Sequence, residues 1–404
     1  MPSFPPSHSD PADARPTTAD VTGPQPADAG RRRTLGRLAA GGLAIAGAPV
    51  FAQSSGRIVL GQSAAFTGPA AQLGIQMNQG ARLAFDAFNA EGGLGGQRIE
   101  LRTLDDGYDP ARCKTNTEKF LEQDVFALFG YVGTPTSLAA LTLVKDGRTP
   151  FFAPFTGAMA LREPVLRSVF HVRASYEDET ALIVKQLTSL GLNRVAVFRQ
   201  NDSYGQAGLD GVTKALKAKG LEPAAVGTVE RNSVDVAGAV KALVAAKPDA
   251  IVQISAYKSC AAFIRAARQA GYGGTFYNVS FVGTQALADE LGAEANGVVV
   301  SQVMPYPYTN SVGIVRDYLG AIQAARDPKI QPNYSSMEGY VAARVFIEGL
   351  KQARSASYDA FVNGLESLSK LNLGGFTVAF GARQHVASRF VELSMLTKDG
   401  GVRR

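Results

Sequence analysis

From Arg57 onward, short runs rich in β-branched and aromatic residues alternate with longer stretches that have helical periodicity. In the helical stretch 76–89, for example, Met77, Ala81 and Phe88 share one face. Strands are predicted at 58–61, 99–104, 126–131 and 151–153, and again at 195–198, 225–229, 250–254 and 276–277. Helices accompany the second set at 177–190, 204–219, 234–246 and 257–270. This alternation predicts parallel sheets covered by helices, and its two runs predict two α/β lobes.

The chain is too long for one compact core, because it has 404 residues, of which 46% are hydrophobic. No Pro- or Ser-rich linker separates the two runs, so we expect the chain to cross between the lobes by short strands that act as a hinge. Asp109 followed by Pro110 predicts a helix start, and Gly92 and Gly220 predict left-handed helix ends.

The first 52 residues are predicted to be a polar leader followed by an export signal peptide. Residues 1–30 have no apolar period, Arg31–Arg33 form a positive cluster, and 38–50 is an apolar run too short to span a bilayer. The small residue Ala52 then provides a suitable position for cleavage by a signal peptidase. The paired arginines resemble a twin-arginine signal, but Gly36 stands where an apolar residue is usual, so ordinary secretion stays open. A short membrane anchor or a disordered tail is the alternative.

Charge and cysteine content exclude several classes of protein. The 41 basic and 35 acidic residues give a net charge of +6 without a concentrated basic arm, so nucleic-acid binding is not implied. Two cysteines exclude a disulfide scaffold and a cysteine-rich metal protein. We expect Cys113 and Cys260 to be free, buried thiols.

The sequence offers no set of residues for catalysis or for a cofactor or metal. After residue 52 it contains only His171 and His385, and the apolar neighbours of His171 favour a core or hinge position. The glycines at 92–96 follow a helix and precede a strand, which is the reverse of a phosphate loop. Asp105, Asp106 and Asp109 lack the spacing of a calcium loop, so a strand end and a helix cap account for them. We therefore expect a protein that is not an enzyme.

Two predicted strands are followed by turns suited to binding an anion. The turn 132–137 supplies a glycine, several hydroxyls and a proline at the start of a helix, and the turn 154–157 supplies a second hydroxyl at the same sheet edge. Together they outline a carboxylate site. Ordinary helix capping would explain the same residues.

Five segments, taken in order, resemble the leucine/isoleucine/valine-type substrate-binding proteins of ABC importers. They are 61–69 (GQSAAFTGP), 87–99 (AFNAEGGLGGQRI), 104–110 (LDDGYDP), 201–205 (NDSYG) and 338–340 (EGY). The resemblance implies a type I periplasmic binding fold, in which two Rossmann-like lobes are joined by a three-strand hinge and close on a small molecule. It places 53–172 with 304–374 in the first lobe, and 173–303 with 375–404 in the second.

The resemblance also implies the positions of the ligand-binding residues. The first lobe would hold the ligand's carboxylate at residues matching Thr134 and the turn Phe155–Gly157, which contains Thr156. The second lobe would contribute aromatic residues matching Tyr204 and Tyr257, and Phe66 and Leu73 of the first lobe would help to line the cleft. For each tyrosine the alternative is an aromatic residue that only packs within the protein.

One position departs from the family pattern. Amino-acid binders in the family place a glutamate after the strand at 276–277, where it neutralises the ligand's ammonium group, and this sequence has Ser280 there. An ammonium group buried without an anion would cost several kcal/mol. Either Glu338 or Asp202 replaces the glutamate, or the ligand is an organic acid without an ammonium group.

The resemblance implies a periplasmic solute-binding protein that delivers a carboxylate ligand to an ABC permease in the inner membrane, without a cofactor and as a monomer. We hypothesise a small organic acid as the ligand, with α-amino acids as the close alternative. A ligand sensor of the same fold, signalling to a regulatory partner, is the alternative function.

Overall fold

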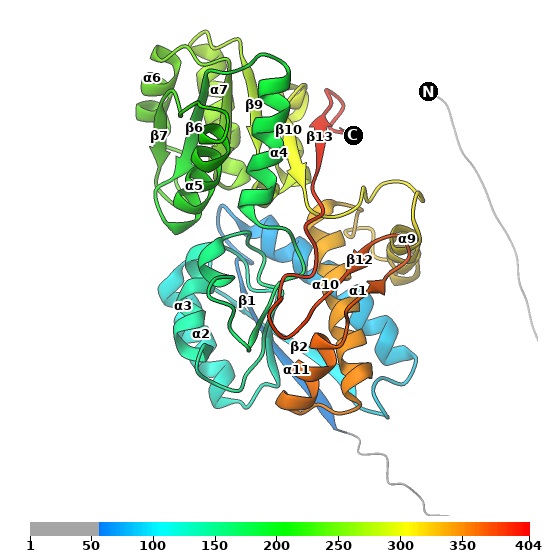
Figure 1. Ribbon diagram of the computed structural model, residues 1–404. Coiled ribbons are helices and arrows are strands. Elements are labelled where there is room, and N and C mark those ends of the chain that lie inside the picture. The colour runs from blue at the N-terminus through cyan, green and yellow to red at the C-terminus, as the bar shows by residue number, and fades with distance from the viewer. Residues whose placement is uncertain (1–55) are drawn as a thin grey trace, which may run out of the picture. The chain divides into compact units, whose positions relative to one another are not determined.

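The computed structural model describes residues 56–404, which form two α/β lobes, each built on its own sheet (Figure 1). The predicted leader, export signal and cleavage position after Ala52 lie outside the described residues. Within the described part, strands and helices alternate as the sequence predicts up to β9, since each predicted strand and helix named above has a counterpart within a few residues.

The sheet of the first lobe has five parallel strands in the order β2-β1-β3-β4-β5. They are β1 (Arg57–Ala64), β2 (Arg98–Asp105), β3 (Ala127–Phe129), β4 (Phe151–Phe152) and β5 (Val169–Phe170). The helices of this lobe are α1 (Ala71–Ala90), α2 (Pro110–Glu122), α3 (Thr134–Val144), α9 (Gly313–Ala325), α10 (Tyr334–Ala353) and α11 (Tyr358–Glu366). The last three return from late in the chain, followed by a short pair, β11 (Leu371–Asn372) and β12 (Thr377–Val378).

The sheet of the second lobe has seven strands in the order β14-β13-β10-β9-β8-β6-β7. They are β6 (Val195–Gln200), β7 (Val226–Val229), β8 (Ala250–Ile254), β9 (Thr275–Asn278), β10 (Val299–Gln302), β13 (Glu392–Leu396) and β14 (Val402–Arg403). The helices are α4 (Tyr176–Ser189), α5 (Ser203–Lys217), α6 (Ala237–Ala245), α7 (Tyr257–Gln269) and α8 (Thr284–Leu291). The strands from β6 to β10 are parallel, whereas β13 and β14 pair antiparallel.

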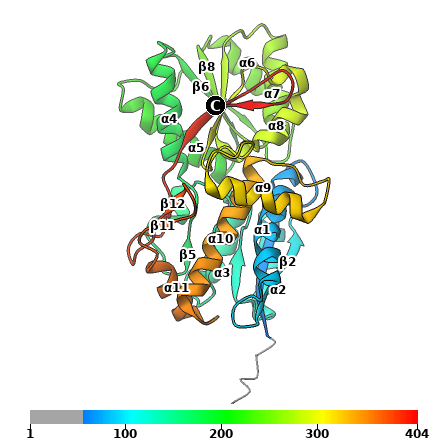
Figure 2. The same ribbon diagram turned by 90° about the vertical axis from the view of Figure 1, so that its right-hand side faces the viewer.

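Three segments connect the lobes, as Figures 1 and 2 show. They lie between β5 and α4, between β10 and α9, and between β12 and β13. The first and third are joined by backbone hydrogen bonds, from His171 N to His385 O (2.8 Å) and from Ala387 N to His171 O (2.8 Å). His171 is therefore a buried residue of the hinge region, as its apolar neighbours indicate.

The last crossing comes later than the predicted position at residue 374. Phe380 and His385 pack against Phe170 of the first lobe, with ring centroids 5.4 Å and 4.0 Å away. Pairing with the second sheet begins only at Glu392, opposite Gln302. The segment 375–386 stays with the first lobe because its apolar side chains are buried there, next to β5.

Local predictions about turns and thiols are confirmed. The Asp109 carboxylate accepts a hydrogen bond from Arg112 N (2.9 Å) and caps α2. Asp105 accepts hydrogen bonds from Phe66 N and Thr67 Oγ1, which outweigh partial burial and hold the pKa of this carboxyl at about 2. Both cysteines are free and buried.

Two searches of residues 56–404 gave negative results. None of their helices combines the length and apolar character needed to cross a bilayer. Nor do they contain a group of three or more His, Cys, Asp or Glu side chains arranged to hold a metal ion.

Glycines let α1 and α10 pack backbone against backbone in the first lobe. A Cβ atom at Gly80 would lie 1.7 Å from Ser336 O, and one at Gly339 would lie 2.1 Å from Met77 O. Carbonyl groups of a helix backbone cannot move aside as a flexible side chain can. This contact fixes α10, and with it Glu338, relative to the first sheet.

Gly80→Ala should therefore destabilise the protein by about 1–3 kcal/mol or more, because an added methyl group overpacks the helix contact. The matched control is Gly320→Ala in α9, where a Cβ atom meets nothing within 4 Å, and helix propensity should stabilise the protein by about 0.5–1 kcal/mol. Urea unfolding of both variants measures the difference. Equal effects of the two substitutions would contradict the assigned contact.

Candidate functional site

The two turns predicted to bind an anion lie side by side at one edge of the first sheet. Val132 and Phe155 form a parallel bridge, and the hydroxyl oxygens of Thr134 and Thr156 are 2.6 Å apart. Both threonines are buried. Because α3 begins at Thr134, the positive end of its dipole also lies here.

Gly133 allows this turn to approach its neighbours closely. Its φ is +100°, and a Cβ atom there would lie 2.2 Å from the ring of Tyr108. The hydroxyl of Thr136 donates a hydrogen bond to Gly133 O (3.0 Å), which holds the turn in shape. Glycine is required on both conformational and steric grounds.

Aromatic side chains from both lobes meet at the boundary between the lobes. The Phe281 ring lies 5.5 Å from Phe155 and 6.0 Å from Tyr108 of the first lobe, and 4.6 Å from Tyr204 of the second. Tyr176 lies 5.4 Å from Tyr204. Tyr204 is therefore at the boundary between the lobes, in a cluster that includes three aromatic residues not predicted from the sequence.

Arg173 lies at the centre of the boundary, in the crossing segment between β5 and α4, and only 1% of its side chain is exposed. Its Nη2 is 3.0 Å from Glu179 Oε1 and also donates to Ser280 Oγ. Its Nη1 is 3.6 Å from Glu338 Oε2 on α10. The guanidinium carbon is 5.0 Å from the ring centroid of Phe155, within range of a cation–π contact. Arg173 thus connects the hinge, α10 of the first lobe and Ser280 of the second.

The two carboxylates beside Arg173 differ in how they are held. Glu179 is fully buried and accepts hydrogen bonds from Ser280 N (2.7 Å) and Ser301 Oγ (2.6 Å). Burial raises the pKa of Glu338 to about 7, although Arg173 opposes the change. Burial alone would lower the pKa of Arg173, but the Glu338 and Glu179 carboxylates raise it above its ordinary value. Arg173 is therefore cationic at every physiological pH.

Several polar atoms around this cluster have no hydrogen-bond partner among the described residues. They are Arg173 Nε and Nη1, Tyr176 Oη and Tyr204 Oη. Leaving a buried polar atom unpartnered costs about 1–3 kcal/mol, so these atoms are suited to a polar ligand or to water. The cavity between Phe155, Ser280 and Glu338 measures only about 10 Å³, so anything larger than a water molecule enters only when the lobes separate.

Other residues predicted for the site lie along different parts of the boundary. Leu73 is buried, and a Cβ atom at Gly283 of the second lobe would lie 2.5 Å from it. Tyr257 is buried, and burial raises the pKa of its hydroxyl while the nearby backbone of Gln72 in the first lobe opposes this change. Phe66 is partly buried above the first sheet. Gly157 packs against Tyr176, whose N would lie 2.6 Å from an added Cβ atom.

Arg173, Glu179 and Phe281 were not predicted from the sequence. Arg173 follows an apolar run and precedes Ser175, the N-cap of α4, so it looks like an ordinary charged residue before a helix. The only available signal was its place at the end of a buried run, because a charge there needs a partner.

Comparison with known proteins gives consistent results. The family model described as "Periplasmic binding protein" matches residues 57–401. The Leu/Ile/Val-binding protein homolog 7 of Brucella abortus is 26% identical over 231 residues, and the match spans 55% of this chain and 58% of the relative. Homolog 8 of the same species is 23% identical over 373 residues, spanning 87% of this chain and 91% of the relative.

Among solved structures, this chain is similar to a protein of Rhodopirellula baltica described as a "possible leucine/isoleucine/valine-binding protein". The two are 34% identical with a TM-score of 0.83, and the match covers 87% of this chain and 96% of that one.

Removing the central cation should strongly destabilise the protein. Arg173→Met leaves Glu179 buried without its cation, and breaking a buried ion pair costs about 3–5 kcal/mol. The exposed pair Lys214–Glu177 provides the control, since Lys214→Met should cost less than about 1 kcal/mol. Urea unfolding at neutral pH measures both, and similar losses in the two variants would contradict a structural role for the buried cluster.

Two buried carboxyls should make stability fall as the pH rises from about 5 to 7, against an opposite contribution from His171, whose pKa is lowered by burial. The pKa of Glu338 is about 7 in the folded protein and near its ordinary value of 4.5 in the unfolded chain, so the unfolded state releases its proton first. Glu338→Gln should reduce this fall but not abolish it, because burial also raises the pKa of Asp106 to about 6. Unfolding free energies at both ends of the range test this, and an unchanged fall in the variant would contradict it.

Proposed function

Because this chain belongs to the periplasmic binding protein family, with relatives of the Leu/Ile/Val-binding type, we propose that it captures a small organic acid between its lobes and delivers it to an ABC importer. In this proposal the acid carries a carboxylate and no ammonium group. The protein acts outside the cytoplasmic membrane, as a monomer and without a covalent step.

The charge distribution around Arg173 is the observation that carries this proposal. Glu179 and Glu338 both face the Arg173 guanidinium, and Ser280 contributes a neutral hydroxyl. Burial also favours the neutral form of Glu338 up to a pH of about 7. A ligand ammonium group would thus meet a fixed cation rather than a free carboxylate, which is unfavourable in a dry site.

Asp202, the second candidate to replace the missing glutamate, also has other partners already. Its carboxylate caps α5 by accepting from Tyr204 N (3.0 Å), accepts from Gln200 Nε2 (2.6 Å), and pairs with Arg231 (3.4 Å). If this carboxylate bound a ligand instead, the backbone N–H groups at the start of α5 would lose their hydrogen-bond acceptor.

The threonine pair supports binding of the acid group. Thr134 and Thr156 share one hydrogen bond, so one hydroxyl hydrogen remains available to donate to a carboxylate oxygen. The start of α3 adds a favourable dipole. Tyr204 and Tyr176 would face the ligand from the second lobe with their unpartnered hydroxyls and ring faces.

Lobe closure supplies the mechanism. Gln200 Nε2 donates to Tyr108 Oη (3.2 Å) and Asn232 Nδ2 donates to Gly107 O (3.0 Å), and both contacts connect the two lobes. A ligand that contacts both lobes shifts the open–closed equilibrium towards closure, because only the closed form makes all of its contacts. The permease then recognises the closed form.

The test uses acids and amino acids that differ only in the amine. Leucine is compared with 4-methylpentanoate, and phenylalanine with 3-phenylpropanoate, by thermal shift and calorimetry. An acid at about 100 times its Kd should stabilise the folded protein by ~2.7 kcal/mol, whereas the matched amino acid should bind at least about tenfold more weakly. Thr134→Val should abolish the shift, and Thr134→Ser should keep it.

Tighter binding of the amino acid than of its matched acid would contradict the proposed ligand class. It would not contradict the proposal that the protein binds a solute between its lobes. An acid that binds equally well to Thr134→Val would contradict the assigned contact.

A further inference from the structure

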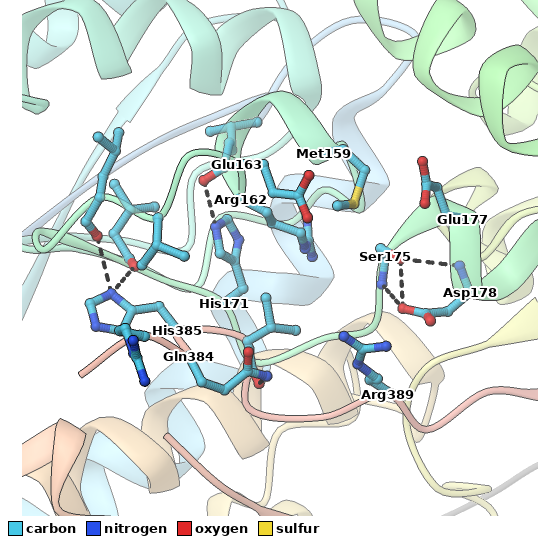
Figure 3. A pocket seen from close by; sticks show the side chains of 16 residues that line it. Met159, Arg162, Glu163, His171, Ser175, Glu177, Asp178, Gln384, His385 and Arg389 are labelled. Carbon is cyan, nitrogen blue, oxygen red and sulfur yellow. Dashed lines mark hydrogen bonds between the residues drawn. The ribbon is translucent and has the colours of Figure 1, made fainter. Parts of the chain in front are cut away.

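Arg162 is a buried arginine that has no carboxylate partner within residues 56–404. It follows the turn 154–157 in the chain and, together with His171, lines a cavity of about 270 Å³ beside the hinge (Figure 3). Only 5% of Arg162 is exposed. The nearby carboxylate of Glu179 pairs with Arg173 instead. A guanidinium buried in this way needs other hydrogen-bond acceptors.

Backbone carbonyl groups from two segments provide those acceptors. Nη1 of Arg162 donates to Thr156 O (3.1 Å) and Ala158 O (3.0 Å), in and just after the turn 154–157. Nη2 donates to Arg173 O (3.2 Å) and Ala174 O (3.3 Å), in the first crossing segment. The planar guanidinium can hold two pairs of acceptors at once because its donors point in fixed directions. One side chain thus connects the turn to the hinge.

Thr156 connects this arrangement to the proposed carboxylate site. Its hydroxyl oxygen is 2.6 Å from that of Thr134 and accepts a hydrogen bond from Ala158 N (3.2 Å). Its carbonyl oxygen accepts from Arg162, as described above. The position of the Thr156 hydroxyl therefore depends on a turn that Arg162 holds against the crossing segment.

The guanidinium also places a positive charge beside this turn. Burial and the charge of Arg173 lower the pKa of Arg162 to about 10, so it remains a cation at neutral pH. Asp178 and Glu179 attract it, but each has a smaller effect. Burial raises the pKa of Glu338 to about 7, and Arg162 is one of the cations that oppose this change, so its charge acts at the lobe boundary. A buried cation there favours an anion, because charges interact strongly where water is excluded.

We propose that Arg162 is a positioning residue for carboxylate binding, which holds Thr156 in place against the hinge and supplies a buried positive charge beside the threonine pair. This inference rests on the proposed function, because it concerns the same site. Lysine cannot replace the guanidinium, since a single ammonium group cannot reach four carbonyls on two segments.

Two backbone amides report on the connection in hydrogen exchange. Ala158 N donates to Thr156 Oγ1 (3.2 Å) within the turn, and Tyr176 N donates to Gly157 O (2.8 Å) between the start of α4 and the turn. Arg162→Lys should speed the exchange of both amides at least about tenfold in the ligand-free protein, because the two segments can then separate locally.

The amide of Val197 is the reference, because it lies in β6, in the sheet of the second lobe, and donates to Ala225 O (2.9 Å). Its exchange should change much less. An equal increase at Ala158, Tyr176 and Val197 is what a loss of overall stability alone would cause, and it would overturn the connection. No increase at Ala158 and Tyr176 would overturn it as well.

Ligand affinity tests the buried charge. 4-Methylpentanoate and 3-phenylpropanoate are each compared with the corresponding amide by calorimetry. Arg162→Met should weaken binding of the acid by at least about tenfold relative to its amide, because only the acid is charged. Arg162→Gln, which is neutral but keeps a hydrogen-bond donor, takes its place if the methionine variant does not fold.

Arg82→Met is the matched control, since it removes an exposed arginine that also donates to a backbone carbonyl of the first lobe, Leu101 O (2.9 Å). It should leave the ratio of acid to amide affinity unchanged. The same ratio in the folded Arg162 variant as in the unmodified protein would overturn the role of the charge. If the unmodified protein binds neither acid, the proposed function fails and the affinity part of this inference fails with it, whereas hydrogen exchange still decides the connection.

Discussion

The buried cation Arg173 lies where the two lobes meet and connects them. Arg173 is held between Glu179 and Glu338, against the ring of Phe155, in one of the three segments that connect the lobes. A buried charge persists only where its partners are fixed, so the elements carrying those partners must be rigid. Glu179 lies in the first turns of α4, which a capping box at Ser175 begins, and Glu338 lies on α10, which packs against α1 through glycine contacts.

The same arrangement connects fold to function. The threonine pair is at the carboxyl edge of the first sheet, where open parallel sheets bind ligands, and the neighbouring aromatic cluster contains residues of both lobes. The proposed anion-binding groups and Arg173 both favour negative charge, and arginines pair with the nearby acidic side chains Glu338 and Asp202. Family membership accounts for the two lobes and the hinge, whereas we propose that the choice of ligand depends on these particular side chains.

Local sequence patterns were sufficient for most of the fold and for part of the site. The strand–helix alternation predicted the elements up to β9, and the turn residues predicted that Thr134 and Thr156 would lie together. The final crossing lies later in the chain than residue 374, because β13 pairs antiparallel with β10, a strand far away in the sequence, and no helix lies between β12 and β13. Arg173 was missed because its partners come from α4, α10 and the turn at Ser280, and no local pattern shows that such a charge is buried.

We propose that the lobes close on a carboxylate while Arg173 takes the place of a ligand ammonium group. A crystal structure of the protein with the acid that stabilises it most tests this directly. We expect the carboxylate within hydrogen-bond distance of Thr134 and Thr156, Tyr204 against the ligand from the second lobe, and the Arg173–Glu179 pair intact. A bound ligand whose ammonium group is held by Glu338 or Asp202, with Arg173 displaced, would contradict it.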